Sequence, residues 1–197
     1  MNRSKGFTKM HQPSLFDSQR MSYRDAIDMS LASLTAYGQR YKHWAIAYSG
    51  GKDSSATAAF VAWAIKNGKV PAPESLTVLY ADTRQELPPL QRTAMQFMDA
   101  LRADGFNAHV VLPSLDDRFY VYMFGRGVGA PKSRFRWCTP QLKVEPMNAA
   151  LETKRAQIGE KFLMLTGVRL GESAARDQRI AVSCSKDSGE CGQGWFQ

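Results

Sequence analysis

The sequence predicts an α/β protein built on an open, mostly parallel, twisted sheet with helices on both faces. Short apolar runs alternate along the chain with helical stretches of about ten to fifteen residues. Parallel strands need a crossover connection, so this alternation is typical of repeated β-α-β units. The chain has 197 residues, which is enough for one domain with a buried core.

Each expected element has its own signal. Apolar side chains recur at helical spacing in the first helix, and the second is rich in Ala and ends at Asn67-Gly68, a C-terminal stop. A proline in its first turn begins the third helix. The expected helices cover residues 23–41, 53–66, 88–103 and 145–156. Apolar runs predict strands at residues 44–48, 76–80, 108–112 and 162–166.

The remaining segments set the domain organisation. Residues 1–20 are polar and have no period, so we expect a flexible N-terminal arm. The α/β domain is expected to cover residues 21–182, followed by a cysteine-containing tail at 183–197. Residues 125–136 are rich in Gly and Arg without an apolar period, which predicts a surface loop.

Composition excludes several classes of protein. With 44% hydrophobic and 22% charged residues, neither a disordered nor a fibrous protein fits. The net charge of +8 suits a polyanionic partner. No apolar run approaches the roughly 20 residues of a membrane span, and the N-terminus lacks a signal peptide's hydrophobic block. We therefore expect a cytoplasmic protein with no membrane partner, whose three cysteines are thiols or metal ligands rather than disulfides.

The most informative segment lies where the first strand should end and a helix begin. Its two glycines allow the main chain to approach phosphate oxygens, and the positive end of the helix favours an anion. Two hydroxyls can donate hydrogen bonds and a lysine adds charge. We call this segment the phosphate loop; it consists of Ser49, Gly50, Gly51, Lys52, Asp53 and Ser54. The alternative is a polar turn with a capping Asp or Ser.

The phosphate loop resembles, at every position, the S-G-G-x-D-S signature of the PP-loop ATP-pyrophosphatase superfamily. The resemblance implies an adenine nucleotide alpha hydrolase-like, Rossmann-like domain whose loop holds the pyrophosphate part of ATP. In members that use ATP, a substrate oxygen attacks the α-phosphate, and a nitrogen or sulfur nucleophile then displaces AMP. Lys52 and Asp53 are thus expected to be catalytic, with Asp53 helping to hold Mg²⁺, which binds carboxylate and phosphate oxygens.

A second motif follows the second expected strand. Asp82 and Thr83 come directly after it, and Glu86-Leu87-Pro88 opens the next helix. This arrangement resembles the second nucleotide-side loop of the phosphoadenylylsulfate (PAPS) reductase branch of the superfamily. The resemblance implies that Asp82 and Thr83 contact nucleotide. The alternative is a capping turn with proline at the first helical position.

A third motif closes the fourth expected strand. The pattern G-V-R-x-x-E-S-x-x-R resembles an element of the same branch and places Gly167, Arg169 and Arg176 among the expected nucleotide-binding residues. A guanidinium group suits this role because its planar fork binds phosphate or sulfate through two hydrogen bonds. The alternative is a surface helix in which Glu172 and Arg176 pair.

Basic and aromatic residues alternate in residues 132–139. Such a stretch can hold a phosphodiester backbone while its rings stack on bases, although an ordinary solvated loop has the same composition. The pattern R-W-C-T-x-x-L-K-x-x-P resembles the segment that carries the first cysteine of sulfur-handling relatives, which implies a catalytic role for Cys138. Cys184 and Cys191 follow in the tail, and the three thiolates are candidate metal ligands.

The order of these motifs and cysteines is similar to that of the sulfurtransferase family of bacterial DNA phosphorothioation, the DndC type. The resemblance runs from about residue 23 to the last residue and is strongest in residues 41–54 and 135–139. It implies ATP and Mg²⁺ as cofactors and a 4Fe–4S cluster held by Cys138, Cys184 and Cys191. It also implies DNA, a cysteine desulfurase and other modification proteins as partners.

Two departures from this family stand out. The sequence has three cysteines where a cluster usually takes four ligands, and relatives continue past the position of Cys191. Either the tail is truncated, or the fourth ligand comes from His, Asp, a substrate or another chain. Glu190-Cys191-Gly192 also resembles the E-C-G-L-H tail of thioredoxin-dependent PAPS reductases, with Gln193-Gly194 in place of Leu-His.

Three alternative functions share the same motifs. A reductase of adenylylsulfate or of its 3′-phosphate would use the same loops, with the nucleotide itself as substrate. A nucleotide-sensing or DNA-binding subunit would keep the pocket without turnover. A tRNA thiolase would also fit, because a basic surface does not distinguish DNA from RNA.

Overall fold

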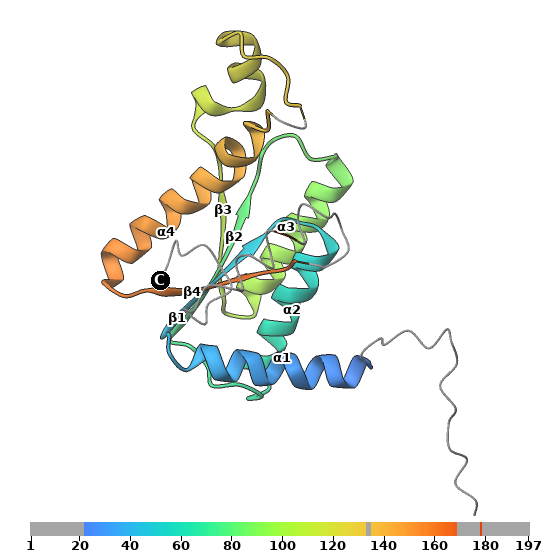
Figure 1. Cartoon of the computed structure of the whole chain (residues 1–197), viewed down its shortest axis with the longest axis vertical. Helices are drawn as coiled ribbons and strands as arrows, with labels where there is room; N and C mark the ends of the chain where they lie inside the picture. Colours follow the sequence, from blue (N-terminus) through green and yellow to red (C-terminus); the bar gives the residue numbers. More distant parts are fainter. Residues whose placement is uncertain (1–21, 133–134, 169–177, 179–197) are drawn as a thin grey trace, which may run out of the picture.

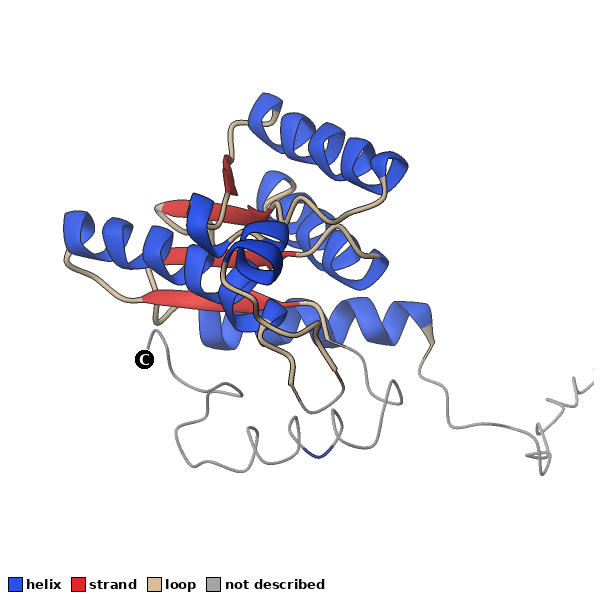
Figure 2. Ribbon diagram, turned by 90° about the horizontal axis from the view of Figure 1, so that it is seen from above, coloured by secondary structure: helices blue, strands red, loops and turns tan. Residues whose placement is uncertain are grey.

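A computed structural model describes residues 22–132, residues 135–168 and Gln178. In this part of the chain, four parallel strands form one sheet in the order β3-β2-β1-β4, with helices on both faces (Figures 1 and 2). The strands are β1 (His43–Tyr48), β2 (Ser75–Ala81), β3 (Asn107–Val111) and β4 (Phe162–Thr166). The predicted α/β fold class is therefore confirmed.

The strand order changes direction between β1 and β4. The chain builds outward from β1 through β2 to β3, and then returns to place β4 on the other side of β1. His43 consequently pairs with Ser75 on one side and with Phe162 on the other. In open α/β sheets such a switch point leaves a crevice at the carboxyl ends of the strands, where ligands bind. The phosphate loop follows β1 at this edge.

Helices α1 (Tyr23–Gly38), α2 (Lys52–Lys66), α3 (Pro88–Ala103) and α4 (Glu145–Ile158) complete the layers. The larger hydrophobic core lies between one sheet face and α1, α2 and α3, and it includes Trp44, Tyr48 and Met98. The smaller core includes Ala45, Leu79 and Leu151 and lies under α4 on the opposite face. Right-handed crossovers require this division, because the chain reverses direction before β4.

Burial on both faces explains why the strands read as continuous apolar runs. In β1, Trp44, Ile46 and Tyr48 belong to the larger core, whereas Ala45 between them belongs to the smaller one. Successive side chains of a strand point to opposite faces, so both sets must be apolar when helices cover both faces.

All eight predicted helices and strands are present, with small shifts at their ends. The largest shift is in α1, which ends at Gly38 and not at residue 41. The Trp44 indole packs directly on Gly38, and its Nε1 donates to the carbonyl oxygens of Gly38 at 3.4 Å and Tyr41 at 3.1 Å. These bonds hold the chain in a turn after the helix. α4 extends two residues past its predicted end and stops at Gly159, which adopts φ 75°.

The segment between β3 and α4, residues 112–144, holds helices that the sequence analysis did not predict. We call it the β3–α4 insertion; Figure 1 shows it in yellow at the top, beyond the carboxyl ends of β2 and β3. It contains the 3-10 helix η1 (Leu115–Asp117) and the π-helices η2 (Val121–Gly125) and η3 (Pro140–Val144). In the predicted loop at 125–136, the described residues after Gly125 form no helix or strand, and Lys132 pairs with Phe135 through the backbone.

Several predictions concern residues beyond the described ranges. The arm at 1–20 and the tail at 183–197 lie there, so the proposed domain boundaries stay predictions. Arg169, Arg176, Cys184 and Cys191 lie there as well. None of the described helices combines the length and apolar character needed to cross a membrane.

Candidate functional site

The phosphate loop makes a tight turn between β1 and α2, and this turn requires the backbone conformation of Gly50. Gly50 adopts φ 75°, in the left-handed region that favours glycine. A Cβ at this position would lie 3.3 Å from the Cβ of Ala94 in α3 and 3.6 Å from the Tyr80 ring of β2. The loop therefore packs against the neighbouring strand and helix, which fixes the path of its main chain.

Hydroxyl groups hold the loop from inside. The buried Ser54 Oγ accepts a hydrogen bond from the Ser49 N–H at 3.1 Å and donates one to the Gly51 carbonyl at 3.0 Å. Ser49 Oγ lies 2.9 Å from Ser54 Oγ. The Ser54 hydroxyl has one proton, which it donates to the Gly51 carbonyl, so this hydroxyl shapes the loop. Direct contact of Ser49 and Ser54 with a nucleotide stays a prediction.

The first turn of α2 is open to an anion. Gly51 is the N-cap and has no side chain to cap the helix, and its own N–H donates to Ser49 Oγ at 3.4 Å. Among the described residues, no side chain accepts from the N–H groups of the next three residues. Lys52 is exposed and Asp53 half-buried, and neither side chain has a hydrogen bond or ion pair with another described residue. An uncapped helix start beside a free ammonium group fits phosphate. A free carboxylate at the same place fits Mg²⁺, which commonly takes one protein carboxylate together with phosphate oxygens.

The end of β4 meets this turn at Gly167. A Cβ on Gly167 would lie 2.7 Å from the carbonyl carbon and oxygen of Asp53 and 2.8 Å from the Cα of Ser54. Such distances are shorter than any real Cβ contact, so only glycine allows the two segments to come this close. The structure thus brings the first and third sequence motifs together at the switch point of the sheet.

The loop after β2 uses its polar side chains internally. Asp82 and Thr83 are buried. The Asp82 carboxylate accepts from the Arg84 N–H at 3.0 Å and the Gln91 amide at 3.1 Å, and it forms an ion pair with the Arg84 guanidinium at 3.3 Å. Arg84 has φ 60°, in the left-handed region. Asp82 therefore shapes the loop and orients Arg84, and its predicted contact with nucleotide stays a prediction.

Tyr80 lies under both loops. Its ring packs 5.6 Å from that of Tyr48, and burial, with the nearby carboxylates of Glu86 and Asp82, raises the pKa of Tyr80 to about 12. The phenol therefore stays neutral at physiological pH and provides no charge to the site.

Glu86 connects the β2 loop with the β3–α4 insertion. Its Oε1 accepts from the Thr83 hydroxyl at 3.3 Å and from the Lys143 ammonium at 3.4 Å. The second motif and the segment after Cys138 are thus adjacent in space. Lys143 belongs to η3, which leads directly into α4.

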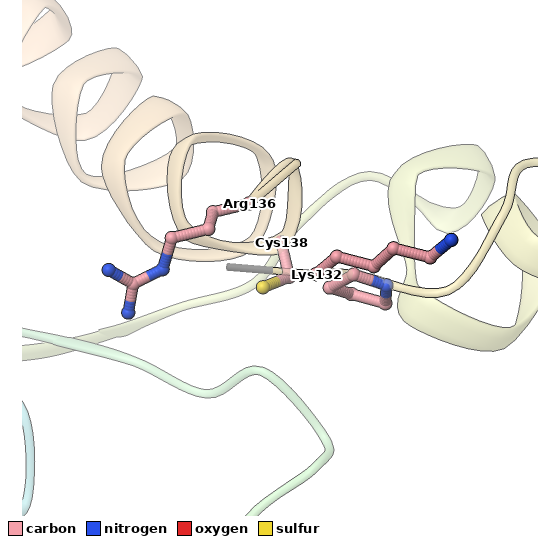
Figure 3. Close-up of a pocket in the computed structure, with 4 residues that line it drawn as sticks. Lys132, Arg136 and Cys138 are labelled. Atoms are coloured by element: carbon pink, nitrogen blue, oxygen red, sulfur yellow. The ribbon is translucent and has the colours of Figure 1, made fainter. Parts of the chain in front are cut away.

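Cys138 lies in a separate open hollow of about 470 Å³, lined in the described part of the chain by Pro131, Lys132, Arg136 and Cys138. Figure 3 shows the Lys132 and Arg136 side chains extending to opposite sides of the Cys138 sulfur. Cys138 is half-buried and its thiol is free. No phosphate-loop residue lines the hollow.

The two aromatic rings of the basic and aromatic stretch lie in different surroundings. Trp137 is buried and so is not available to stack on bases. Its ring packs on Phe119 at 5.3 Å and Tyr122 at 4.8 Å, and its Nε1 donates to the Gly129 carbonyl at 3.0 Å. The indole is therefore the core of the insertion, whereas Phe135 of the same stretch is 49% exposed.

The described residues do not fit an iron–sulfur cluster by themselves. Within residues 22–132 and 135–168 no three His, Cys, Asp or Glu side chains gather closely enough to hold a metal ion, and Cys138 is the single cysteine there. A cluster usually takes four thiolates.

A profile of the phosphoadenosine phosphosulfate reductase domain matches residues 43–190, well over half of the chain. The chain belongs to this family. The match begins at the first residue of β1 and includes the phosphate loop, the β2 loop, Cys138 and Gly167. Membership in the phosphoadenosine phosphosulfate reductase domain family implies an adenine-nucleotide ligand and an enzyme of the ATP-pyrophosphatase class. A comparison with curated proteins found no match.

Sequence reasoning missed two features of this phosphoadenosine phosphosulfate reductase domain. Arg84 and Gln91, which hold Asp82, carry no motif of their own, although Arg84 directly follows Asp82-Thr83. The Glu86–Lys143 contact joins residues far apart in the sequence. Glu86 and Lys143 each belong to a motif, but nothing in a single sequence pairs the two.

Proposed function

We propose that the chain is an ATP-pyrophosphatase-type sulfurtransferase that adenylates its substrate for sulfur insertion, with the DNA backbone as substrate. The observation that carries this proposal is the first turn of α2, where Lys52 and Asp53 have no side-chain partner within the described ranges, at the switch point of the sheet. Family membership supports the nucleotide and the class of enzyme.

The main chain of the phosphate loop and Lys52 would bind the β- and γ-phosphates of ATP. An oxygen of the substrate attacks the α-phosphorus, the bond to the pyrophosphate oxygen breaks, and pyrophosphate leaves with the charge that Lys52 and the helix N–H groups neutralise. Asp53 would hold Mg²⁺, which when bound supplies further neutralisation of phosphate charge. A sulfur nucleophile then attacks the activated atom of the substrate, and AMP leaves.

Cys138 is our candidate to relay the sulfur as a persulfide, formed from a cysteine desulfurase acting with other modification proteins. After the terminal sulfur bonds to the substrate and AMP leaves, an external thiol would reduce the sulfur–sulfur bond, which releases the product and restores the Cys138 thiol. The hollow around it is flanked by two cations, which favours an anionic substrate. Because the described residues supply one thiolate, we route no step through a 4Fe–4S cluster. Arg169, Arg176, Cys184 and Cys191 keep their predicted roles in binding nucleotide and metal.

The divergence of Lys132 and Arg136 favours a polymer over a small sulfonucleotide. A single sulfate or phosphate is bound best by donors that converge on it, whereas these two side chains extend to opposite sides of Cys138 (Figure 3). Two separated cations suit successive phosphates of a strand. A reductase of adenylylsulfate or of its 3′-phosphate is the second candidate, favoured by the family match itself.

Product analysis separates these candidates. With Mg²⁺ and ATP, we expect pyrophosphate and AMP, released faster when DNA is added. Lys52→Ala should reduce the rate about tenfold or more, since hydrogen bonds to charged groups contribute about 1.5–3 kcal/mol. Lys66→Ala, at the other end of the same helix and paired with Asp104, is the matched control and should keep the rate.

Other products would identify the alternatives. Sulfite formed from labelled adenylylsulfate, with no pyrophosphate from ATP, would replace the sulfurtransferase with the reductase. Binding of ATP without any turnover would indicate a nucleotide-sensing or DNA-binding subunit. Greater stimulation by tRNA than by DNA would indicate a tRNA thiolase.

A further inference from the structure

The β3–α4 insertion carries two aromatic rings that face solvent. Tyr120 and Phe124 are 59% and 75% exposed, one helical turn apart at η2. Their rings are parallel, with an interplanar angle of 2° and centroids 6.0 Å apart. Exposed rings of this size cost free energy in water, so a parallel pair on the surface indicates a ligand with flat, apolar faces.

An aromatic cluster of the buried Trp137 and the half-buried Phe119 and Tyr122 holds this pair in place. Phe119 contacts the Tyr120 ring edge-on at 5.5 Å and stacks on Trp137 at 5.3 Å. Tyr122, on the turn between the exposed rings, packs on Trp137 at 4.8 Å. Packing on this cluster restricts the exposed rings before a ligand binds. They therefore lose little conformational freedom on binding, which favours affinity.

The same segment is strongly basic. The β3–α4 insertion has two acidic residues, Asp116 and Asp117, against Arg118, Arg126, Lys132, Arg134, Arg136 and Lys143. The Arg126 guanidinium lies 5.4 Å from the centroid of the Tyr122 ring and 3.9 Å from the carboxylates of both aspartates. Arg126 is thus fixed beside the aromatic turn, and Lys132 and Arg136 flank the hollow at Cys138.

We propose that Tyr120 and Phe124 form a stacking platform for unpaired bases of a nucleic-acid strand whose phosphates are held by Lys132 and Arg136. Stacking on aromatic rings beside a basic track is how proteins bind single strands without reading their sequence, because every base offers a flat face. A duplex keeps its bases stacked on one another and offers the platform only its edges and its ends. This inference rests on the proposed nucleic-acid substrate and specifies its form: a strand that is unpaired at the site.

The test is the equilibrium binding of a fluorescein-labelled 20-nucleotide single strand and of its duplex, measured by anisotropy. We expect the single strand to bind more tightly than the duplex. Phe124→Ala and Tyr120→Ala should each weaken single-strand binding about fivefold or more, while Phe124→Tyr should retain it, since the ring persists. Tyr23→Ala is the matched control, because Tyr23 is 83% exposed but lies on α1.

Salt dependence tests the phosphate contacts separately. Lys132→Ala and Arg136→Ala should each reduce the slope of log K against log salt by about 0.7, the value for one contact with a single strand. Phe124→Ala should weaken binding without changing that slope.

Three results would overturn the proposal: unchanged single-strand binding in Phe124→Ala, an equal loss for duplex and single strand, or self-association of the chain that Phe124→Ala abolishes while oligonucleotide binding persists. The last would make the rings a protein interface.

Binding of ATP to each variant, measured without nucleic acid, separates these outcomes from failure of the proposed function. Loss of the platform leaves ATP binding intact, whereas a wild-type chain that binds no ATP contradicts the proposed enzyme.

Discussion

The phosphate loop and the β3–α4 insertion lie at the same edge of the sheet but are built differently. The loop uses main chain, two glycines and small hydroxyls, all within six consecutive residues. The insertion depends on large rings brought together from separate positions, with Trp137 packed between Phe119 and Tyr122. The loop is therefore specified locally, whereas the insertion depends on side-chain packing across its whole length.

The largest effect is expected from Trp137→Ala. Removing a buried indole costs about 3–5 kcal/mol, and here the loss falls on the insertion. We expect faster proteolysis at Lys132 and Arg136 and weaker single-strand binding, with ATP affinity unchanged. Limited proteolysis and calorimetric titration with ATP measure the two regions separately. Trp63→Ala removes an indole that is 41% exposed, and it should leave the proteolysis rate and the ATP affinity unchanged. Loss of ATP binding in Trp137→Ala would show that the two regions are not independent.

Gly167→Ala should weaken ATP binding and leave single-strand binding intact, the opposite of Trp137→Ala. The added methyl group overlaps the main chain of Asp53, and relief of such overlap typically costs about 1–3 kcal/mol. Displacement of the first turn of α2 should weaken ATP binding about tenfold or more, which corresponds to about 1.4 kcal/mol. Single-strand binding should persist. Gly129→Ala is the matched control, because the space around Gly129 is open. Equal ATP affinity in both variants would contradict the close contact between β4 and α2.

A smaller effect is expected at Arg84, in the loop after β2. Arg84→Ala and Arg84→Gly both remove the ion pair with Asp82, but glycine adopts φ 60° without strain. Arg84→Gly should therefore be more stable than Arg84→Ala by about 1 kcal/mol, measured by urea unfolding. If alanine were equally stable, the loop would not hold the left-handed conformation.

The smallest effect concerns His109 on β3, next to the insertion. Partial burial and the positive charges of Lys154 and Arg102 lower the pKa of His109 below 6.5. The unfolded chain then binds a proton that the folded chain does not, so this residue makes the free energy of unfolding fall as the pH drops below about 6.5. His109→Gln should remove that dependence, which urea unfolding at pH 5 and pH 7.5 measures. An identical dependence in both proteins would assign the effect to another group.

The sequence was sufficient for the sheet and its phosphate loop because their signals are local. Strands buried on both faces must be apolar throughout, as in β1, and a helix start that binds phosphate needs Gly50, Gly51 and a free first turn. Each of these requirements produces a recognisable pattern within a few consecutive residues. Gly167 was identified through its motif, but its contact with Asp53 depends on the return of the chain from β3 to β4.

The insertion could not be predicted in the same way. Its short π-helices show no strong periodicity of apolar residues. Its core consists of rings from separate parts of the segment, such as Phe119 and Trp137. The alternation of basic and aromatic residues at 132–139 predicts either rings that stack on bases or an ordinary solvated loop, and neither prediction places Trp137 in a core. Burial of its ring depends on Phe119 and Tyr122, which no local pattern connects to it. The buried Asp82 likewise depends on Gln91 from the next helix.

The position of β4 has a consequence for synthesis of the protein. A nascent chain that has left the ribosome only as far as α4 contains the entire phosphate loop, yet it lacks the strand that Gly167 follows. Until β4 emerges, β1 has one unpaired edge, and the first turn of α2 lacks its contact with Gly167. The complete turn therefore forms only after four strands and all the helices between them have been synthesised.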